Sequence, residues 1–201
     1  MEGSAMLLRP ARPADQDALY EVALRTGDGG ADGTDLFDDS RILGDVYVGP
    51  YLNLEPRLAF TLDIEGPAGY LLAALDTPDF ENRCSRSWWP ILRERYPLTA
   101  KRRATDAELV SLIHQPPTRP ADLVSAYPSH LHIDLLPRVQ GQGYGPRMLA
   151  TMLTVLADAG SSGVHLGVAP GNSRAQRVYR ALGFDDWQLL DDELVMVRAL
   201  P

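Results

Sequence analysis

The chain has 201 residues, enough to bury one sizeable core, and its composition is that of an ordinary globular protein. Its formal net charge of −8 argues against nucleic acid or an anionic membrane as the main partner. It has no run of 18 apolar residues and no signal-peptide pattern, so we expect no membrane span and a cytoplasmic location. Cys84 is the single cysteine, which excludes an intramolecular disulfide, and we expect it to be buried as a small hydrophobic residue.

The first third of the chain alternates between strand and helix patterns. Asp15 is expected to cap a helix that runs to about Arg25, because apolar residues then recur on one face. The stretch 27–40 is rich in Gly and Asp and reads as a loop. The other elements predicted here are a strand at 6–10, a helical stretch at 41–51, and a hairpin of strands 57–64 and 69–75.

Residues 77–128 form the least regular part of the sequence. A segment of this length between two sheet strands is expected to have structure of its own, and we predict a helical insertion. It contains Trp88 and Trp89, which we expect to be exposed and available to an interface such as a homodimer. It also contains the basic run Lys101-Arg102-Arg103, followed by a helical pattern near 106–114.

The strand predicted around 130–135 carries polar side chains on one face. His130, His132 and Asp134 alternate with apolar residues, so all three point to the same side of the sheet. Burying a carboxylate in an apolar strand is costly unless it is paired, which makes Asp134 a candidate for a raised pKa. A structural carboxylate bonded to His132 or to a backbone amide is the alternative. Two histidines two residues apart, with no third ligand in spacing, exclude a zinc site.

A glycine-rich turn follows this strand and opens a helix over 146–159. We expect Gly141, Gly143 and Gly145 to allow positive φ and a close approach to the backbone. The free amides at a helix N-terminus favour an anion such as a phosphate. The turn is neither a P-loop, since no Gly-Lys-Ser/Thr follows, nor the dinucleotide pattern, since its spacing is G-x-G-x-G. A tight turn without a ligand is the alternative.

The C-terminal part predicts one more helix and a final hairpin. Asn172 is a good N-cap, and Tyr179 lies seven residues further on, near the end of that helix. Strands are predicted at 187–190 and 194–199, with Asp191-Asp192 as the turn between them.

Two motifs resemble those of the GNAT acetyltransferases. Arg138-x-x-Gly141-x-Gly143 is similar to the Q/R-x-x-G-x-G/A signature of that family. The downstream pattern Asn172-x-x-Ala175-x-x-x-Tyr179-x-x-x-Gly183-Phe184 is similar to its second motif, at the expected distance. The resemblance implies one α/β domain over 1–201 with the GNAT fold. That fold is a central, mixed but mostly antiparallel twisted sheet, flanked by helices and splayed at the cofactor-binding strands.

Other segments resemble the acetyltransferase-like C-terminal domain of O-GlcNAcase. They are Gly49-Pro50-Tyr51-Leu52, residues 68–76, Trp88/Trp89-Pro90 and Tyr127-Pro128-Ser129. This likeness implies a free-standing relative of that domain. Because the chain keeps the glycine-rich turn, which the animal domain lacks, the comparison favours coenzyme A binding here.

The family resemblance implies transfer of an acetyl group from acetyl-coenzyme A to an amine of a small molecule or peptide, without a metal. The chemistry needs a base for the amine and an acid for the leaving thiolate. Tyr179 is the implied acid. Asp134 or its neighbour His132 is the expected base, with His130 or water as further options. The implied cofactor-binding residues are Leu135, Leu136, Arg138, Val139, Gln140, Gly141, Gln142, Gly143, Tyr144, Gly145, Asn172 and Tyr179. The basic run at 101–103 is a further candidate, for the coenzyme's 3′-phosphate, although a solvated helix start is the favoured explanation of that run.

The same resemblance leaves a second function open. A coenzyme A-binding pseudo-acetyltransferase, or an interaction module without turnover, would share the fold and the glycine turn. The sequence has no glutamate at the place where many GNAT enzymes carry their base, which supports this alternative. Acetyl transfer to a panel of amines separates the two.

Overall fold

One mixed sheet organises the protein, which was analysed as a computed structural model describing residues 7–190 and 193–201. Seven strands in the described residues form the sheet, in the order β1-β2-β3-β4-β5-β7-β6. Every neighbouring pair is antiparallel except β4 and β5, as predicted for a mixed but mostly antiparallel sheet. The strands are β1 (Leu7–Pro10), β2 (Ala59–Asp63), β3 (Pro67–Ala74), β4 (Ser129–Leu135), β5 (Gly163–Val168), β6 (Asp185–Leu190) and β7 (Glu193–Ala199).

The predicted hairpin is confirmed as β2 and β3, with a turn in which Glu65 and Gly66 both have positive φ. β3 is the most buried strand because helices cover both of its faces, and its sequence is accordingly apolar along its whole length. The predicted strand at 6–10 is present from Leu7. The predicted turn at Asp191-Asp192 lies outside the described residues, as does Met6.

The sheet opens between its two central strands. β4 and β5 pair only at Ser129 with Val164 and at His130 with His165, and no further pairs follow along β4. Beyond these pairs the two strands separate: β4 continues to the glycine-rich turn, and β5 continues to the loop before α9. The expected splay is therefore present, and it leaves the inner edges of both strands unpaired over most of their length.

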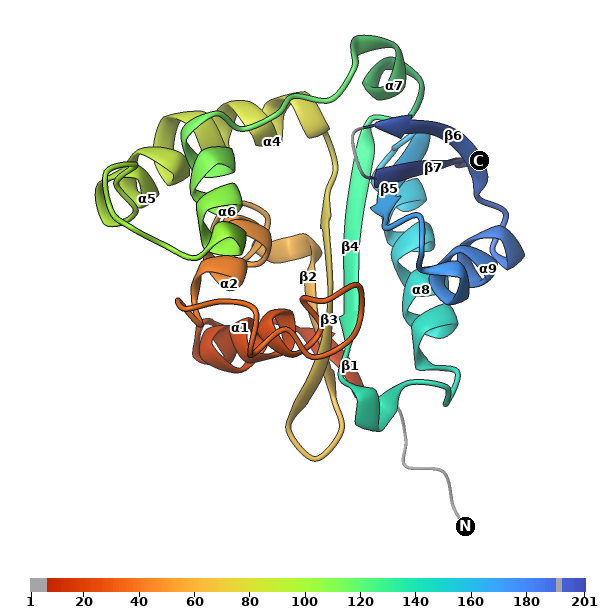
Figure 1. The fold of residues 1–201 in the computed structure, drawn as a ribbon. Helices are drawn as coiled ribbons and strands as arrows, with labels where there is room; N and C mark the ends of the chain where they lie inside the picture. Colours follow the sequence, from red (N-terminus) through yellow and green to blue (C-terminus); the bar gives the residue numbers. More distant parts are fainter. Residues whose placement is uncertain (1–6, 191–192) are drawn as a thin grey trace.

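Helices cover both faces of the sheet (Figure 1). One buried cluster, the first core, lies between β3 and the helices from α1 to α6. The other, the second core, lies between the opposite face and the helices α8 and α9. The helical elements outside the insertion are η1 (Pro13–Asp15), α1 (Gln16–Arg25), α2 (Ile42–Tyr47), α3 (Gly49–Leu54), η2 (Pro56–Leu58), η4 (Pro137–Val139), α8 (Tyr144–Asp158) and α9 (Ser173–Ala181).

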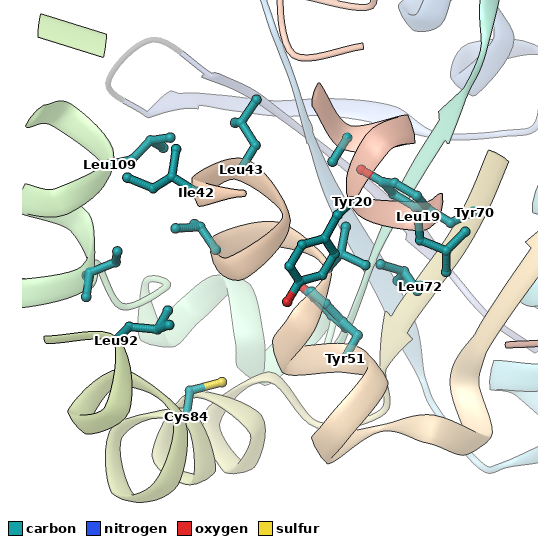
Figure 2. Close-up of a cluster of buried hydrophobic side chains, with 14 of the residues drawn as sticks. Leu19, Tyr20, Ile42, Leu43, Tyr51, Tyr70, Leu72, Cys84, Leu92 and Leu109 are labelled. Atoms are coloured by element: carbon teal, nitrogen blue, oxygen red, sulfur yellow. The ribbon is translucent and has the colours of Figure 1, made fainter. Parts of the chain in front are cut away.

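The insertion at 77–128 is helical, as predicted. It contains α4 (Thr77–Arg83), a π-helical turn η3 (Cys84–Trp88), α5 (Trp89–Arg95), α6 (Ala104–His114) and α7 (Ala121–Ala126). Cys84 packs in the first core at 1% exposure (Figure 2), and burial raises the pKa of its thiol to about 12. The expectation of exposed tryptophans is wrong. Trp89 is buried, and Trp88 is half-buried with its indole N–H donating to the Asp45 carbonyl oxygen at 2.9 Å.

Asp15 precedes α1 as expected, but its side chain does not cap the α1 amides. Its carboxylate instead accepts from the Arg12 backbone N–H at 2.7 Å and from the Arg9 guanidinium. That pairing holds the pKa of the Asp15 carboxyl below its usual value, chiefly through the Arg9 hydrogen bond. Asp15 therefore ties the start of α1 to β1. Among residues 7–190 and 193–201, no helix has the length and apolarity needed to cross a membrane.

Candidate active site

A cleft of about 630 Å³ occupies the place where β4 and β5 separate. Its walls come from four parts of the chain that lie far apart in the sequence. These are the loop after α1, the length of β4 beyond its pairing with β5, the glycine turn with the start of α8, and the end of β5 with the start of α9. The polar and glycine residues that line it include Thr26, His132, Asp134, Gln140, Gly141, Gly143, Asn172, Arg174 and Tyr179.

The glycine turn has the backbone that its sequence predicts at two of its three glycines. Gly141 has φ 77° and Gly143 has φ 79°, a left-handed region that side chains with a Cβ rarely adopt. Gly145 differs from the expectation, because it lies inside the first turn of α8 and has no positive φ. α8 also begins at Tyr144, two residues earlier than predicted, with Gly143 as its N-cap.

The amides of this turn have no acceptor within the described chain. The backbone N–H groups of Gly141, Gln142, Gly143 and Tyr144 donate no hydrogen bond to residues 7–190 or 193–201. They stand at the N-terminus of a 15-residue helix, where the helix dipole adds positive potential. The Arg174 guanidinium lies beside Gly141 and donates to the Gln140 side-chain oxygen at 3.2 Å. A pyrophosphate fits this combination of free donors, glycine backbone and cation.

Other residues of the predicted cofactor set have structural roles. The Arg138 side chain donates to the Ile64 carbonyl oxygen at 2.7 Å, and the Gln142 amide donates to the Arg138 carbonyl oxygen at 2.8 Å. The side chains of Val139 and Tyr144 are buried in the second core. These four side chains hold the turn in place and do not line the cleft.

The backbone of β4 presents alternate residues to the cleft. Leu136 donates its N–H to the Ala68 carbonyl oxygen at 2.9 Å, and its own carbonyl oxygen accepts from Val139. Both backbone groups of Leu136 are therefore hydrogen-bonded within the fold, contrary to the expectation that they would pair with the pantetheine arm. In an antiparallel ladder the intervening residues face the other way, so Leu135 and Ile133 turn their backbone groups to the cleft. The Leu135 carbonyl oxygen accepts from the Gln140 side chain at 2.8 Å, which leaves its N–H available.

Asp134 lies in the cleft wall with its carboxylate held by one neighbour. Tyr70, on β3, donates its hydroxyl to Asp134 Oδ2. Burial raises the pKa of the Asp134 carboxyl to about 6, while hydroxyl groups of Tyr70 and Thr26 act in the opposite direction. The predicted raised pKa is therefore present. The alternative partners, His132 or a backbone amide, are not the ones that the structure shows.

The two histidines of β4 differ in their surroundings. His132 lines the cleft near the rings of Tyr47 and Tyr51, and burial lowers its pKa to about 4. His130 lies deeper, where the Tyr51 hydroxyl and the Thr77 hydroxyl each contact one ring nitrogen at 2.7 Å. Because Thr77 donates to the Pro128 carbonyl oxygen, the His130 Nδ1 must donate to Thr77 and Nε2 must accept from Tyr51. Both nitrogens of His130 are thus occupied within the fold.

Tyr179 approaches the cleft from α9, on the wall opposite Asp134. Its ring is buried in the second core beside Phe184, at 5.9 Å between ring centroids. Its hydroxyl makes no hydrogen bond within the described part of the chain, and the residue lines the cleft. Burial and, secondarily, the Asp134 charge raise the pKa of the phenol above its ordinary value. The phenol is therefore protonated at neutral pH and can donate.

A strap of loop residues, Gly29 to Ala31, forms part of the cleft wall. Asn172 caps α9, accepting from the Ala175 amide at 3.1 Å, and its side-chain N–H donates to the Gly29 carbonyl oxygen at 3.1 Å. This contact joins residues 143 positions apart and brings the loop from Gly29 to Ala31 into the cleft wall. The basic run at 101–103 is not in this wall. Arg103 pairs with Asp38 at 3.3 Å, and Arg102 lies over the Tyr96 ring.

Sequence reasoning missed Tyr70, the hydrogen-bond partner of Asp134, and several cleft residues, for different reasons. Tyr70 and Asp134 face each other only through strand pairing, which no local pattern reveals. The loop from Gly29 to Ala31 reads as an ordinary polar turn. Arg174 had a usable signal, since it follows the Asn172 cap by two residues and so lies at a helix start that faces the glycine turn.

Comparison with known proteins places these observations in a family context. Residues 73–184 match the model of the acetyltransferase (GNAT) family. The crystal structure of SsHAT superimposes with a TM-score of 0.87 at 35% identity, covering 98% of each chain. Over 180 residues, the chain is 28% identical to protein O-GlcNAcase from Rattus norvegicus and from Mus musculus, covering 88% of this chain. It spans only about a fifth of the length of those two proteins. A Salmonella typhimurium structure, the putative acetyltransferase YncA with acetyl-CoA, shares the fold at a TM-score of 0.57 and 15% identity, covering 98% of this chain and 95% of that one.

Proposed function

The chain belongs to the acetyltransferase (GNAT) family, and we propose that it moves an acetyl group from acetyl-coenzyme A directly to an amine. The observation that carries the proposal is the row of free amides from Gly141 to Tyr144. It opens on the same cleft as the Asp134 carboxyl and the Tyr179 hydroxyl. This arrangement supports a cleft in which one end binds phosphate and the other end transfers protons.

In this proposal acetyl-coenzyme A lies in the gap between β4 and β5. Its pyrophosphate accepts from the amides of the glycine turn, with Arg174 beside it. The pantetheine amides pair with the free inner edge of β4, where the Leu135 N–H and the backbone of Ile133 face the cleft. The arm thus continues the sheet at the point where the β4–β5 ladder stops.

The acetyl end then lies between Asp134 and Tyr179. The Asp134 carboxylate takes a proton from the amine, whose nitrogen forms a bond to the thioester carbonyl carbon. The carbon–sulfur bond breaks, and the Tyr179 hydroxyl donates to the departing sulfur. The proton that Asp134 took from the amine then returns to the Tyr179 phenolate, so that the products are an amide and a neutral coenzyme A thiol and both side chains recover their starting states. His132 is neutral at pH 7 and supports this end of the cleft as an uncharged hydrogen-bonding group.

Two measurements on the purified protein test the proposal. Calorimetric titration with acetyl-coenzyme A and with coenzyme A is expected to give saturable, micromolar binding. Product release from acetyl-coenzyme A in the presence of a panel of small amines, amino acids and short peptides is expected to identify an acceptor. Binding without turnover across the panel would assign the chain as a coenzyme A-binding pseudo-acetyltransferase, and absence of binding would refute the cleft assignment altogether.

A further inference from the structure

Among the described residues, Tyr70 is the side chain that donates a hydrogen bond to the carboxylate of Asp134, and it comes from a different strand. We propose that Tyr70 is a positioning residue for the reaction, which fixes the Asp134 carboxylate through Oδ2 and leaves Oδ1 to meet the acceptor amine. This inference rests on the proposed function, because it assigns a role to Tyr70 through the base of that reaction. Three independent features of the structure support it.

The first feature is the strand register. Tyr70 on β3 lies directly opposite Asp134 on β4, so both side chains are on the same face of the sheet. In an antiparallel ladder every second residue pair is joined by backbone hydrogen bonds. Leu136 and Ala68, two residues further along the ladder, form such a pair, so Tyr70 and Asp134 form one as well. The distance between the two Cα atoms is therefore fixed by the ladder, and the contact does not depend on a mobile loop.

The second feature is the rigidity of the phenol. Tyr70 is 2% exposed and belongs to the first core, where it packs among the buried side chains drawn in Figure 2. Its ring has no room to turn, so the hydroxyl direction is set by the packing. Burial, followed by the Asp134 charge, raises the pKa of the phenol well above its ordinary value. Tyr70 therefore remains a hydrogen-bond donor at every working pH and does not compete with Asp134 for the amine proton.

The third feature is that the two oxygens of the Asp134 carboxylate have different surroundings. Tyr70 donates to Oδ2. The Thr26 hydroxyl lies beside the carboxylate, but its hydrogen-bond geometry directs it to the Val22 carbonyl oxygen at 2.8 Å. No described residue donates to Oδ1 with hydrogen-bond geometry, and Asp134 is part of the cleft wall. The orientation that Tyr70 imposes is the one that a base needs.

The side chains that surround the Asp134 carboxyl carry no charge at pH 7. The groups around it are Tyr70 on β3, Thr26 after α1, Tyr179 on α9 and His132 on its own strand, with Tyr47 and Tyr51 behind Tyr70. Each of these is neutral at pH 7. A donor that stabilises the carboxylate therefore acts without a competing charge, and its loss favours the protonated form.

Tyr70→Phe tests the inference, because phenylalanine keeps the packing and removes the single hydroxyl. The acid limb of the pH profile of kcat/KM is expected to move up by about one pH unit, which is the size of one hydrogen bond to a charged group. The midpoint of the Asp134 carboxyl, followed by ¹³C NMR and assigned by its absence in Asp134→Asn, is expected to move by the same amount. Tyr20→Phe is the matched control. It removes another buried phenol oxygen of the first core, one that has no geometrically defined hydrogen-bond partner among the described residues, and should move neither midpoint.

The outcomes separate this inference from the proposed function. An Asp134 midpoint that is unchanged in Tyr70→Phe would overturn the inference. A carboxyl midpoint that moves while the acid limb of kcat/KM stays in place would overturn the catalytic role of the pair. In that case the coenzyme cradle and Tyr179 would remain as assigned. If no amine is acetylated, the proposed function fails, and the NMR titration alone then decides whether Tyr70 holds the carboxylate.

Discussion

The raised pKa of the Asp134 carboxyl predicts how the activity depends on pH. Its pKa lies near 6, above the ordinary value for an aspartate, so the carboxylate needed as a base is present at pH 7 and disappears below pH 6. We expect kcat/KM to fall about tenfold per pH unit below that point, and Asp134→Asn to remove most of the activity. A pH–rate profile measures this. A limb near pH 4 would instead assign the base to His132, whose pKa is about 4.

Tyr179 offers a second test with a single atom removed. Tyr179 lines the cleft, its hydroxyl has no hydrogen-bond partner in the described part of the chain, and its ring packs in the second core, so Tyr179→Phe should preserve the fold. We expect kcat to fall about a hundredfold and the Kd for acetyl-coenzyme A to change by less than about threefold, because only the leaving thiolate loses a donor. Steady-state kinetics and calorimetry separate the two numbers. A large loss of affinity with normal kcat would make Tyr179 a binding residue.

The glycines at the two ends of α8 provide a matched pair of variants. Gly143 precedes α8 and Gly160 follows it, both have positive φ, and a Cβ at either would meet no atom within 4 Å. Gly143→Val and Gly160→Val should therefore cost similar backbone strain, about 1–2 kcal/mol each. Only Gly143→Val places a side chain in the phosphate cradle. We expect calorimetry to show loss of acetyl-coenzyme A binding in Gly143→Val alone, and equal loss in both variants would refute the cradle.

The strap from Gly29 to Ala31 is hydrogen-bonded to the start of α9 through the Asn172 side chain, which also caps that helix. Asn172→Ser keeps an oxygen for the Ala175 amide and loses the donor to Gly29, whereas Asn172→Ala loses both. We expect Asn172→Ala to lower the free energy of unfolding by about 1 kcal/mol, and Asn172→Ser to lower it much less. Amide hydrogen exchange in the loop 27–33 should accelerate in both variants. Unchanged exchange in Asn172→Ser would show that the strap is held by other contacts.

The elements were largely predictable from the sequence, and their mutual contacts were not. The glycine turn, the Asn172 cap and the alternation along β4 are local patterns, so they fixed the strand–turn–helix order and the candidates Asp134 and Tyr179. The partner of Asp134 comes from β3, 64 residues away, and depends on strand register. The inward-facing backbone of Leu136 depends on the same register. Asp15 was expected to act locally, but the Arg9 ion pair, formed by packing against β1, determines where its carboxylate points.

At the scale of the molecule, the cleft divides the sheet into two parts joined by only two residue pairs. A ligand that contacts both walls of the cleft links the two parts of the sheet and so stabilises the folded protein. At 100 times its Kd, acetyl-coenzyme A should add about 2.7 kcal/mol to the free energy of unfolding, which corresponds to a rise in Tm of about 5–10 °C. Thermal unfolding with and without ligand measures the shift. Gly143→Val should show none, and a similar shift in that variant would indicate binding elsewhere.

The unpaired inner edges of β4 and β5 also bear on how the protein behaves at high concentration. A strand edge with free N–H and C=O groups normally invites pairing with other chains and leads to aggregation. Here the free edges face each other across a recess, with α8, α9 and the strap from Gly29 to Ala31 around them. A strand of a neighbouring molecule cannot lie flat against either one, whereas a slender chain with amide groups can enter. We therefore expect these edges to pair less readily with other copies of the protein than the free edge of an open sheet would.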